Sequence, residues 1–235
     1  MTKNLIANMV KNSSRHYLDQ FAARAARSVP DESIVLDAGA GEGQYLHHFT
    51  HTEYESADFC HLDKQYGTIT YVCDLSEIPV EDNRYDLVFC SQTLEHMPDP
   101  LQVLKELYRV LKPGGELWLS APLFFEEHEV PYDFYRYTQY GFRYLLETAG
   151  FSIKEIEWLE GYYGTLSYEL RMAARVLPMH AEEYGGGITG LLALLLVLFL
   201  KPTFYLVSIV FSRLDIRYKF FSKGHCKNYS VVAVK

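Results

Sequence analysis

The sequence lacks an excess of basic side chains, paired cysteines and a leader-like N-terminus. Its 22 Lys and Arg stand against 30 Asp and Glu, a formal net charge of −8. This balance argues against a nucleic-acid partner, because phosphates are neutralised by clustered basic side chains. None of the four cysteines, at positions 60, 73, 90 and 226, forms a C-x-x-C pair, so a reducing, cytoplasmic compartment is expected. No signal peptide is predicted, because the N-terminus has no uninterrupted apolar run.

A dinucleotide-binding fingerprint is also missing, although residues 34–43 read IVLDAGAGEG. The fingerprint G-x-G-x-x-G needs a glycine at position 44, where this chain has Gln44. The apolar run before Asp37 is short enough for a buried strand, and glycines at alternate positions let the backbone approach a ligand closely. The stretch therefore predicts a strand and a turn beneath a nucleotide-like ligand.

Two further acids follow predicted strands. Asp58 ends the strand expected at 54–58, about 20 residues after the glycine turn, where doubly wound folds place the carboxylate that binds ribose hydroxyls. A solvated loop aspartate is the alternative. Asp74 and Leu75 follow a third expected strand at 69–73, and a fourth is expected at 85–90.

The next section carries the most specific pattern. Ser91 and Gln92 open a loop that contains Leu94-Glu95-His96, and a helix with core-spaced leucines follows. Residues 111–115, LKPGG, end that helix and turn into a fifth strand at 116–121.

With the glycine turn and the two acids, these motifs resemble the class I S-adenosylmethionine-dependent methyltransferases, of the type 11-like branch that acts on small molecules and surface glycans. The resemblance implies a Rossmann-like α/β sheet of seven strands, mostly parallel with the last antiparallel, flanked by helices. It also implies S-adenosylmethionine as methyl donor, held at the glycine turn, the strand-end acids and the start of the loop. The implied cofactor-binding residues are Asp37, Gly39, Ala40, Gly41, Gly43, Asp58, Asp74, Leu75, Ser91 and Gln92.

Residues 122–140 are aromatic and charged, and they follow the fifth strand at the edge where α/β sheets bind ligands. We expect a lid that binds the methyl acceptor, with plain hydrophobic packing as the alternative. If the acceptor is a hydroxyl, His128 is the first candidate for a general base and Asp133 the second, since imidazole titrates near neutral pH. The guanidinium group of Arg136 would suit an anionic acceptor but could equally pair with Asp133. The expected acceptor-binding residues are His96, Tyr132, Tyr135 and Arg136, with His96 shaping the pocket more than acting as a base.

Residues 2–29 are expected to form one or two amphipathic helices, either packed on the sheet or acting as a flap with Tyr17 over the cofactor. A crossover helix is expected at 44–51. It would place His47 and His51 on one face, but no further ligand is apparent, so we expect a histidine cluster and no metal.

The seventh strand, expected near 228–234, is delayed by a segment in which residues 188–211 are almost wholly apolar. Lys201 and Pro202 should divide this run into two pieces, each too short to span a bilayer. Both ends of the insertion must lie on one side of any membrane if the last strand is to join the sheet. We expect contact with a membrane surface, or a homodimer or core contact instead, and a true span least of all.

The chain is thus expected to be one methyltransferase domain at 1–235: a helical flap at 1–30, a cofactor-binding core at 31–159, a hydrophobic insertion at 160–225 and a last strand at 226–235. Expected partners are a small-molecule, glycan or lipid-linked sugar acceptor and no nucleic acid. Lipid or quinone biosynthesis, or a non-catalytic cofactor-binding subunit, are the alternatives. The expected location is cytoplasmic, at the inner face of the membrane.

Overall fold

The protein is described here from a computed structural model, over residues 12–63 and 65–235. The chain divides into two compact units. One comprises Tyr17–Leu159 with Lys227–Lys235 and contains the sheet. The other comprises Glu160–Cys226 with the described residues up to His16, and it is helical.

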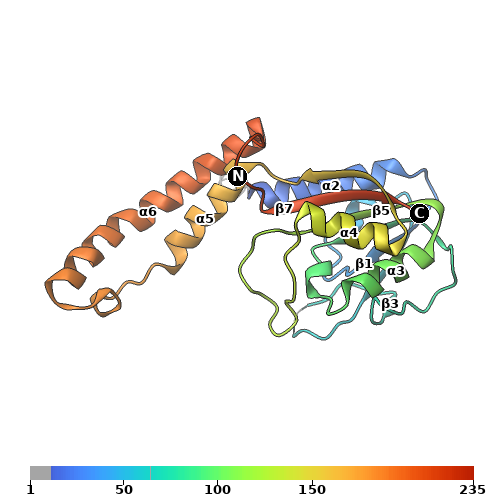
Figure 1. Ribbon diagram of the computed structural model, residues 1–235, viewed down its shortest axis with the longest axis horizontal. Coiled ribbons are helices and arrows are strands. Elements are labelled where there is room, and N and C mark those ends of the chain that lie inside the picture. Colours follow the sequence, from blue (N-terminus) through green and yellow to red (C-terminus); the bar gives the residue numbers. More distant parts are fainter. Residues whose placement is uncertain (1–11, 64) are drawn as a thin grey trace. The chain divides into compact units, whose positions relative to one another are not determined.

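The sheet has seven strands in the order β3-β2-β1-β4-β5-β7-β6 (Figure 1). Strands β1 to β5 pair in parallel, whereas β7 runs antiparallel to both β5 and β6. The predicted fold class is therefore confirmed. The strands are β1 Ile34–Ala38, β2 Glu53–Asp58, β3 Tyr71–Val72, β4 Tyr85–Ser91, β5 Leu111–Pro122, β6 Ser152–Trp158 and β7 Asn228–Val234.

Helices cover the sheet on both faces (Figure 1). Phe21 of α2 (Ser13–Ser28) packs against Phe89 and Trp118, in a core that fills one face. The other face of the sheet is covered by α3 (Pro100–Val110) and α4 (Gln139–Ala149). The alternate strand residues that point to this face are buried as well. Thr138 caps α4 by accepting the N–H of Gly141, and Gly150 ends the helix in a left-handed conformation.

The segment after the glycine turn corrects the predicted crossover helix at 44–51. Only the short 3-10 helix η1 (Leu46–His48) forms there. Gly39, Gly41 and Gly43 all have positive φ angles, which keeps the backbone out of the helical region through residue 43. Beyond residue 43 the backbone hydrogen bonds join residues three apart, such as His48 N–H to the carbonyl of Tyr45 and Phe49 N–H to that of Leu46, which is the 3-10 pattern. The third strand is likewise shorter than the predicted 69–73.

The helical unit is built on an antiparallel pair, α5 (Tyr162–Val176) and α6 (Gly187–Tyr218), with the short helix η3 (Ala181–Tyr184) between them. Ser167 Oγ donates to the carbonyl of Ser208, and Lys201 Nζ donates to the carbonyl of Leu177. The predicted division at Lys201-Pro202 is wrong, because Pro202 lies inside one continuous helix. A proline removes one backbone hydrogen bond and kinks a helix more readily than it ends one in so apolar a run.

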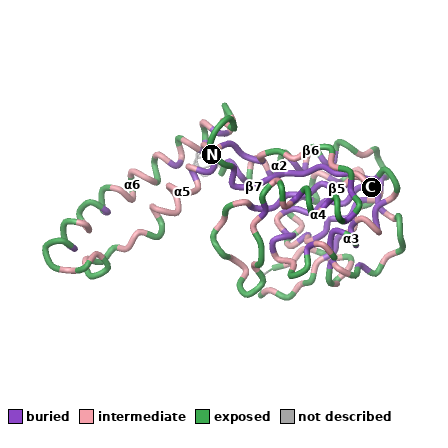
Figure 2. The backbone as a smooth tube through the Cα atoms, viewed as in Figure 1, coloured by how far each residue is buried: buried purple, intermediate pink, exposed green. Residues whose placement is uncertain are grey.

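The pair buries small and polar residues and exposes apolar ones. In α6 the buried positions include Gly190, Ser208 and Ser212, and in α5 they are Gly164, Thr165 and Ser167. Figure 2 shows the contrast, with buried backbone along the strands and exposed or half-buried backbone along α5 and α6. An 18-residue window of α6 has a mean hydropathy of 2.2 and is only 11% buried, and α6 is long and apolar enough to cross a membrane. The exposed apolar residues of α6 include Ile188, Leu191, Leu192, Leu195, Leu196, Leu198, Phe199, Leu206 and Val210.

Candidate active site

The glycine turn lies at the carboxyl end of β1, beside the ends of β2 and β4. Gly39 has φ +85°, and a Cβ there would lie 2.2 Å from Cγ2 of Thr93. The first glycine is therefore required both by its backbone angle and by a side chain from the loop after β4. Thr93 was not among the predicted site residues, because nothing in its local sequence shows which backbone it meets.

The second and third glycines face open space. A Cβ on Gly41 or Gly43 would meet no described atom within 4 Å, although both residues have positive φ. This is the geometry expected where a ligand approaches the backbone. Ala40, between the first and second glycines, is buried, and its N–H donates to the carbonyl of Ala57 at 3.3 Å.

Asp58 holds this turn in place. Its Oδ2 accepts the N–H of Gly41 at 2.9 Å and its Oδ1 accepts the N–H of Cys60 at 3.0 Å. A carboxylate has about four acceptor positions, so lone pairs remain for a ligand hydroxyl. The predicted ribose-binding acid thus also shapes the loop that would carry the rest of the cofactor.

Asp37 is buried at the end of β1, and the hydroxyl of Tyr54 donates to its Oδ2 at 2.5 Å. The pKa of Asp37 is raised to about 7, mainly by burial and to a smaller extent by the charge of Asp58, against the lowering effect of the Tyr54 hydrogen bond. A cationic ligand group would favour the ionised form. Tyr54 was missed because its role depends on pairing between β1 and β2.

The third acid lies differently. Asp74 is exposed, and its Oδ1 accepts the N–H of Ser76 at 2.8 Å, while Leu75 is buried. At the end of β4, Ser91 Oγ lies 2.9 Å from Ser120 Oγ, and Gln92 N–H donates to the carbonyl of Ser120. These contacts fix the start of the loop against β5.

Residues 122–138, which we call the lid, are tied to the Leu94-Glu95-His96 loop. The carbonyl of Glu95 accepts the N–H groups of Phe134 (2.9 Å) and Tyr135 (3.2 Å), and the Tyr137 hydroxyl donates to the carbonyl of Leu94. Tyr135 also donates its hydroxyl to the carbonyl of Pro98. Tyr132 is partly exposed, so this predicted acceptor residue is accessible.

Arg136 pairs within the lid. Its two terminal nitrogens donate to the two oxygens of Asp133 at 2.6 and 2.7 Å, and its other bonds go to backbone carbonyls, including that of Phe125. Of the two roles considered for Arg136, this geometry favours the internal pair. The guanidinium holds the pKa of Asp133 well below its ordinary value, against the raising effect of burial. Asp133 is therefore a weaker candidate for a general base than either histidine.

His96 and His128 meet at the junction of loop and lid, with ring centroids 4.7 Å apart. His96 Nδ1 lies 2.6 Å from the carbonyl of Tyr132, and His128 Nδ1 lies 3.2 Å from the carbonyl of Glu126 and 3.3 Å from Asp133 Oδ2. Burial is the main cause that lowers the pKa of His96. Each ring thus donates its Nδ1 proton to the protein and keeps a lone pair on Nε2.

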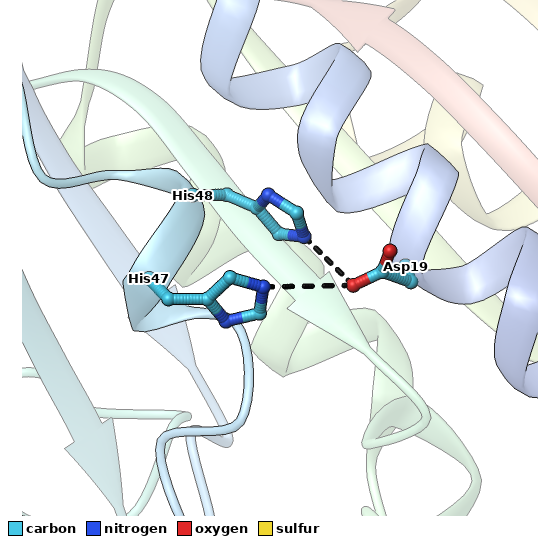
Figure 3. A group of neighbouring side chains, drawn as sticks. All are labelled: Asp19, His47 and His48. Carbon is cyan, nitrogen blue, oxygen red and sulfur yellow. Dashed lines mark hydrogen bonds and ion pairs between the residues drawn. The ribbon is translucent and has the colours of Figure 1, made fainter. Parts of the chain in front are cut away.

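The second histidine cluster lies away from this loop. Figure 3 shows His47 and His48 of η1 directed at Asp19 of α2, with His48 Nε2 2.8 Å and His47 Nε2 3.6 Å from Asp19 Oδ1. His51 instead lies 3.0 Å from the carbonyl of Ala26. The expected 47/51 pair is therefore replaced by 47/48 with an acid from α2, and Asp19 and His47 are exposed.

Sheet order, glycine turn and strand-end acids together define the class I methyltransferase fold. Residues 36–119 match a family model described as a methyltransferase domain. The predicted resemblance to the class I S-adenosylmethionine-dependent methyltransferases is therefore confirmed for this part of the chain.

Two relatives and one solved structure illustrate the match. A ubiquinone biosynthesis O-methyltransferase of Coxiella burnetii is 39% identical over 62 residues, 26% of either chain. A probable S-adenosylmethionine-dependent methyltransferase of Mycolicibacterium smegmatis is 30% identical over 135 residues, 52% of either chain. The matched regions span a quarter to about half the length of these relatives. Among solved structures, the (4+2)-cyclase SpnF superposes with a TM-score of 0.57 at 18% identity, over 92% of this chain and 81% of that one, a likeness of fold alone.

Proposed function

We propose that the protein transfers a methyl group from S-adenosylmethionine to a small-molecule, glycan or lipid-linked sugar acceptor. The observation that carries this proposal is the open glycine turn, with Asp58 bound to its Gly41 amide, facing the same sheet edge as a polar lid. We call the glycine turn with the ends of β1 to β3 the donor side. The lid with the Leu94-Glu95-His96 loop is the acceptor side.

The donor-side residues fit the cofactor chemically. Asp37 offers a buried carboxylate for the amino group, and the backbone N–H groups of the turn suit the cofactor's carboxylate. Asp58 would bind the ribose, and Asp74 with Leu75 the adenine. The cofactor, when bound, supplies a methyl group on a positively charged sulfur, which is already a good leaving group. The chain's task is then mainly alignment, which contributes on the order of 7–11 kcal/mol to such reactions.

On the acceptor side, His128 remains our first candidate for a general base and His96 the second. Both keep a lone pair on Nε2 in the tautomers that their Nδ1 contacts favour. A base is needed only for a hydroxyl acceptor, because an amine or carbanion acceptor brings its own lone pair.

A membrane-borne acceptor is favoured by the helical unit. The α5–α6 pair buries small and polar residues and exposes leucines, which is the pattern of helices packed in lipid. A complete crossing fits poorly: α6 would be about 48 Å long, but α5, which must return, would be about 22 Å against a hydrocarbon core of about 30 Å. We propose that the pair lies in the inner face of the membrane. Lipid-linked sugars suit such a location, and so does a quinone, the pathway named for the Coxiella relative.

The proposal is tested by incubating purified protein with methyl-labelled S-adenosylmethionine and membranes or soluble extract of the source cells. Label in the lipid fraction, lost in Asp58→Ala, would support a lipid-borne acceptor. Label in a water-soluble fraction would support the reaction but refute the membrane-borne acceptor. Cofactor binding without label in any fraction would favour a non-catalytic subunit.

Membrane contact is tested separately by liposome flotation. Wild-type protein should float, and Leu195→Glu/Leu198→Glu should not. Wild-type protein that stays soluble and elutes as a dimer would overturn membrane contact, since α6 would then be covered by a second copy.

A further inference from the structure

Glu95 is an unusual residue on the acceptor side. Its side chain is fully buried, and neither carboxylate oxygen accepts a hydrogen bond from another residue of the described chain. Buried carboxyl groups are normally paired, because an unsatisfied one costs the free energy of its desolvation. Glu95 takes no part in the contacts that form the donor side.

Two histidines complete a set of ligands around it. His96 Nε2 lies 3.9 Å from Glu95 Oε1, and ligand atoms from Glu95, His96 and His128 all lie within 4.8 Å of one another. Atoms bound to one zinc ion at about 2.0–2.1 Å lie about 3.3 Å apart in a tetrahedron. Closing separations of up to 4.8 Å to about 3.3 Å requires the ligand atoms to approach by about 1.5 Å or less, and His128 is the most exposed of the three ligands.

The surroundings of the histidines favour a metal ion. A metal-binding imidazole normally donates its other N–H to a carbonyl or carboxylate, which fixes the tautomer. His96 Nδ1 has the Tyr132 carbonyl, and His128 Nδ1 has the Glu126 carbonyl with Asp133 Oδ2 nearby. The tautomer with the proton on Nδ1 leaves each Nε2 lone pair for a ligand, and His96 Nε2 also lies 3.7 Å from Glu129 Oε2.

We propose that Glu95, His96 and His128 bind a divalent transition-metal ion of the zinc type. Two imidazoles and one carboxylate suit such an ion, and three protein ligands leave a coordination position open. The site joins the loop to the lid, so the ion would fix the lid. With the ion bound, the Nε2 lone pairs of His96 and His128 would be used as metal ligands and neither histidine would act as a base. Where the proposed methyl transfer holds, the ion itself would then favour an acceptor that carries a hydroxyl, since a bound cation lowers the pKa of an oxygen ligand. Metal binding itself does not rest on that function. It contradicts the expectation of no metal drawn from the sequence.

The exposed cluster of Asp19, His47 and His48 supplies a matched control (Figure 3). It holds the same types of ligand atom, but Asp19 and His47 are exposed and His48 already contacts Asp19 at 2.8 Å. Any metal bound by the whole chain must be assigned to one cluster or the other.

The test is titration of chelator-treated, full-length protein with Co²⁺ alone, followed by visible absorption, and with Zn²⁺ by calorimetry, without S-adenosylmethionine. We expect one ion per chain, an affinity at least tenfold weaker in both Glu95→Gln and His128→Ala, and no change in His48→Ala. Glu95→Gln keeps the shape of the buried side chain, and His128 lies in the lid, so the two variants do not share one risk of misfolding.

Absence of a cobalt spectrum in the wild type, or a spectrum that Glu95→Gln retains, would overturn the proposal. Loss of binding in His48→Ala alone would assign the ion to the exposed cluster and overturn it as well. Titration of S-adenosylhomocysteine into the same variants separates this outcome from failure of the proposed function. Cofactor affinity should stay within about twofold in Glu95→Gln.

Discussion

The donor and acceptor sides lie at the same sheet edge but are formed by different chemical groups. The donor side is largely backbone: three glycines with positive φ, and N–H groups held by a strand-end acid. The acceptor side is made of ionisable side chains from the lid and the Leu94-Glu95-His96 loop. Backbone geometry binds the constant part of a reaction, whereas side chains select the variable part. Substitutions should therefore separate cofactor affinity from acceptor use.

The largest effect is expected for Gly39→Val on the donor side. Its side chain would overlap Thr93, and it would adopt a left-handed conformation that costs about 1–3 kcal/mol. We expect S-adenosylhomocysteine affinity to fall at least a hundredfold in calorimetry. Gly114→Ala is the control, because Gly114 has φ +81° with no neighbour near its Cβ position. It should lose about 1 kcal/mol of stability and no cofactor affinity.

Asp58→Ala should weaken cofactor binding at least tenfold. It removes the acceptor of the Gly41 amide and the expected ribose ligand together. Unchanged affinity in calorimetry would exclude Asp58 from the cofactor site. Asp58→Asn should fall in between, because an amide oxygen can still accept the Gly41 N–H.

Cofactor affinity should also depend on pH through Asp37. The pKa of Asp37 is raised to about 7 in the free protein, so lowering the pH protonates the carboxylate that would bind the cofactor's amino group. Affinity should fall about tenfold from pH 8 to pH 6. Asp37→Asn should bind weakly and lose most of that dependence. A flat profile in the wild type would contradict the role of Asp37.

A smaller effect, confined to the acceptor side, is expected for Arg136→Lys. Lysine cannot make the paired contacts to Asp133, so the lid should loosen and acceptor KM rise about three- to fivefold. Cofactor affinity should remain within about twofold. If cofactor affinity fell by the same factor as acceptor KM rose, the two sides would not be separable.

The donor side was predictable from the sequence because its signals are local. A short apolar run, an acid and alternating glycines specify the turn, and its partner Asp58 follows one strand later. Tyr54 and Thr93 escaped prediction because their contacts depend on strand pairing and on the path of a distant loop. The histidines at 47, 48 and 51 were assigned to an α-helix, whereas only a short 3-10 helix and a turn form there.

The sequence indicated which residues form the acceptor side, but it did not indicate how they contact one another. The pairing of Asp133 with Arg136 was one of two open alternatives, and geometry was needed to favour it. The burial of Glu95 could not be foreseen, because a Leu-Glu-His triplet does not reveal which residue points inward. In α6, the sequence indicates the apolar run, but the effect of Pro202 was overestimated, because a helix can continue through a proline at the loss of one backbone hydrogen bond.

Hydrogen–deuterium exchange with and without S-adenosylhomocysteine tests the separation of the two sides most directly. S-adenosylhomocysteine should slow exchange in peptides covering 37–45, 56–62 and 74–78, with a smaller change in the lid. Protection confined to the lid or to α5 and α6, with none at the glycine turn, would contradict that separation.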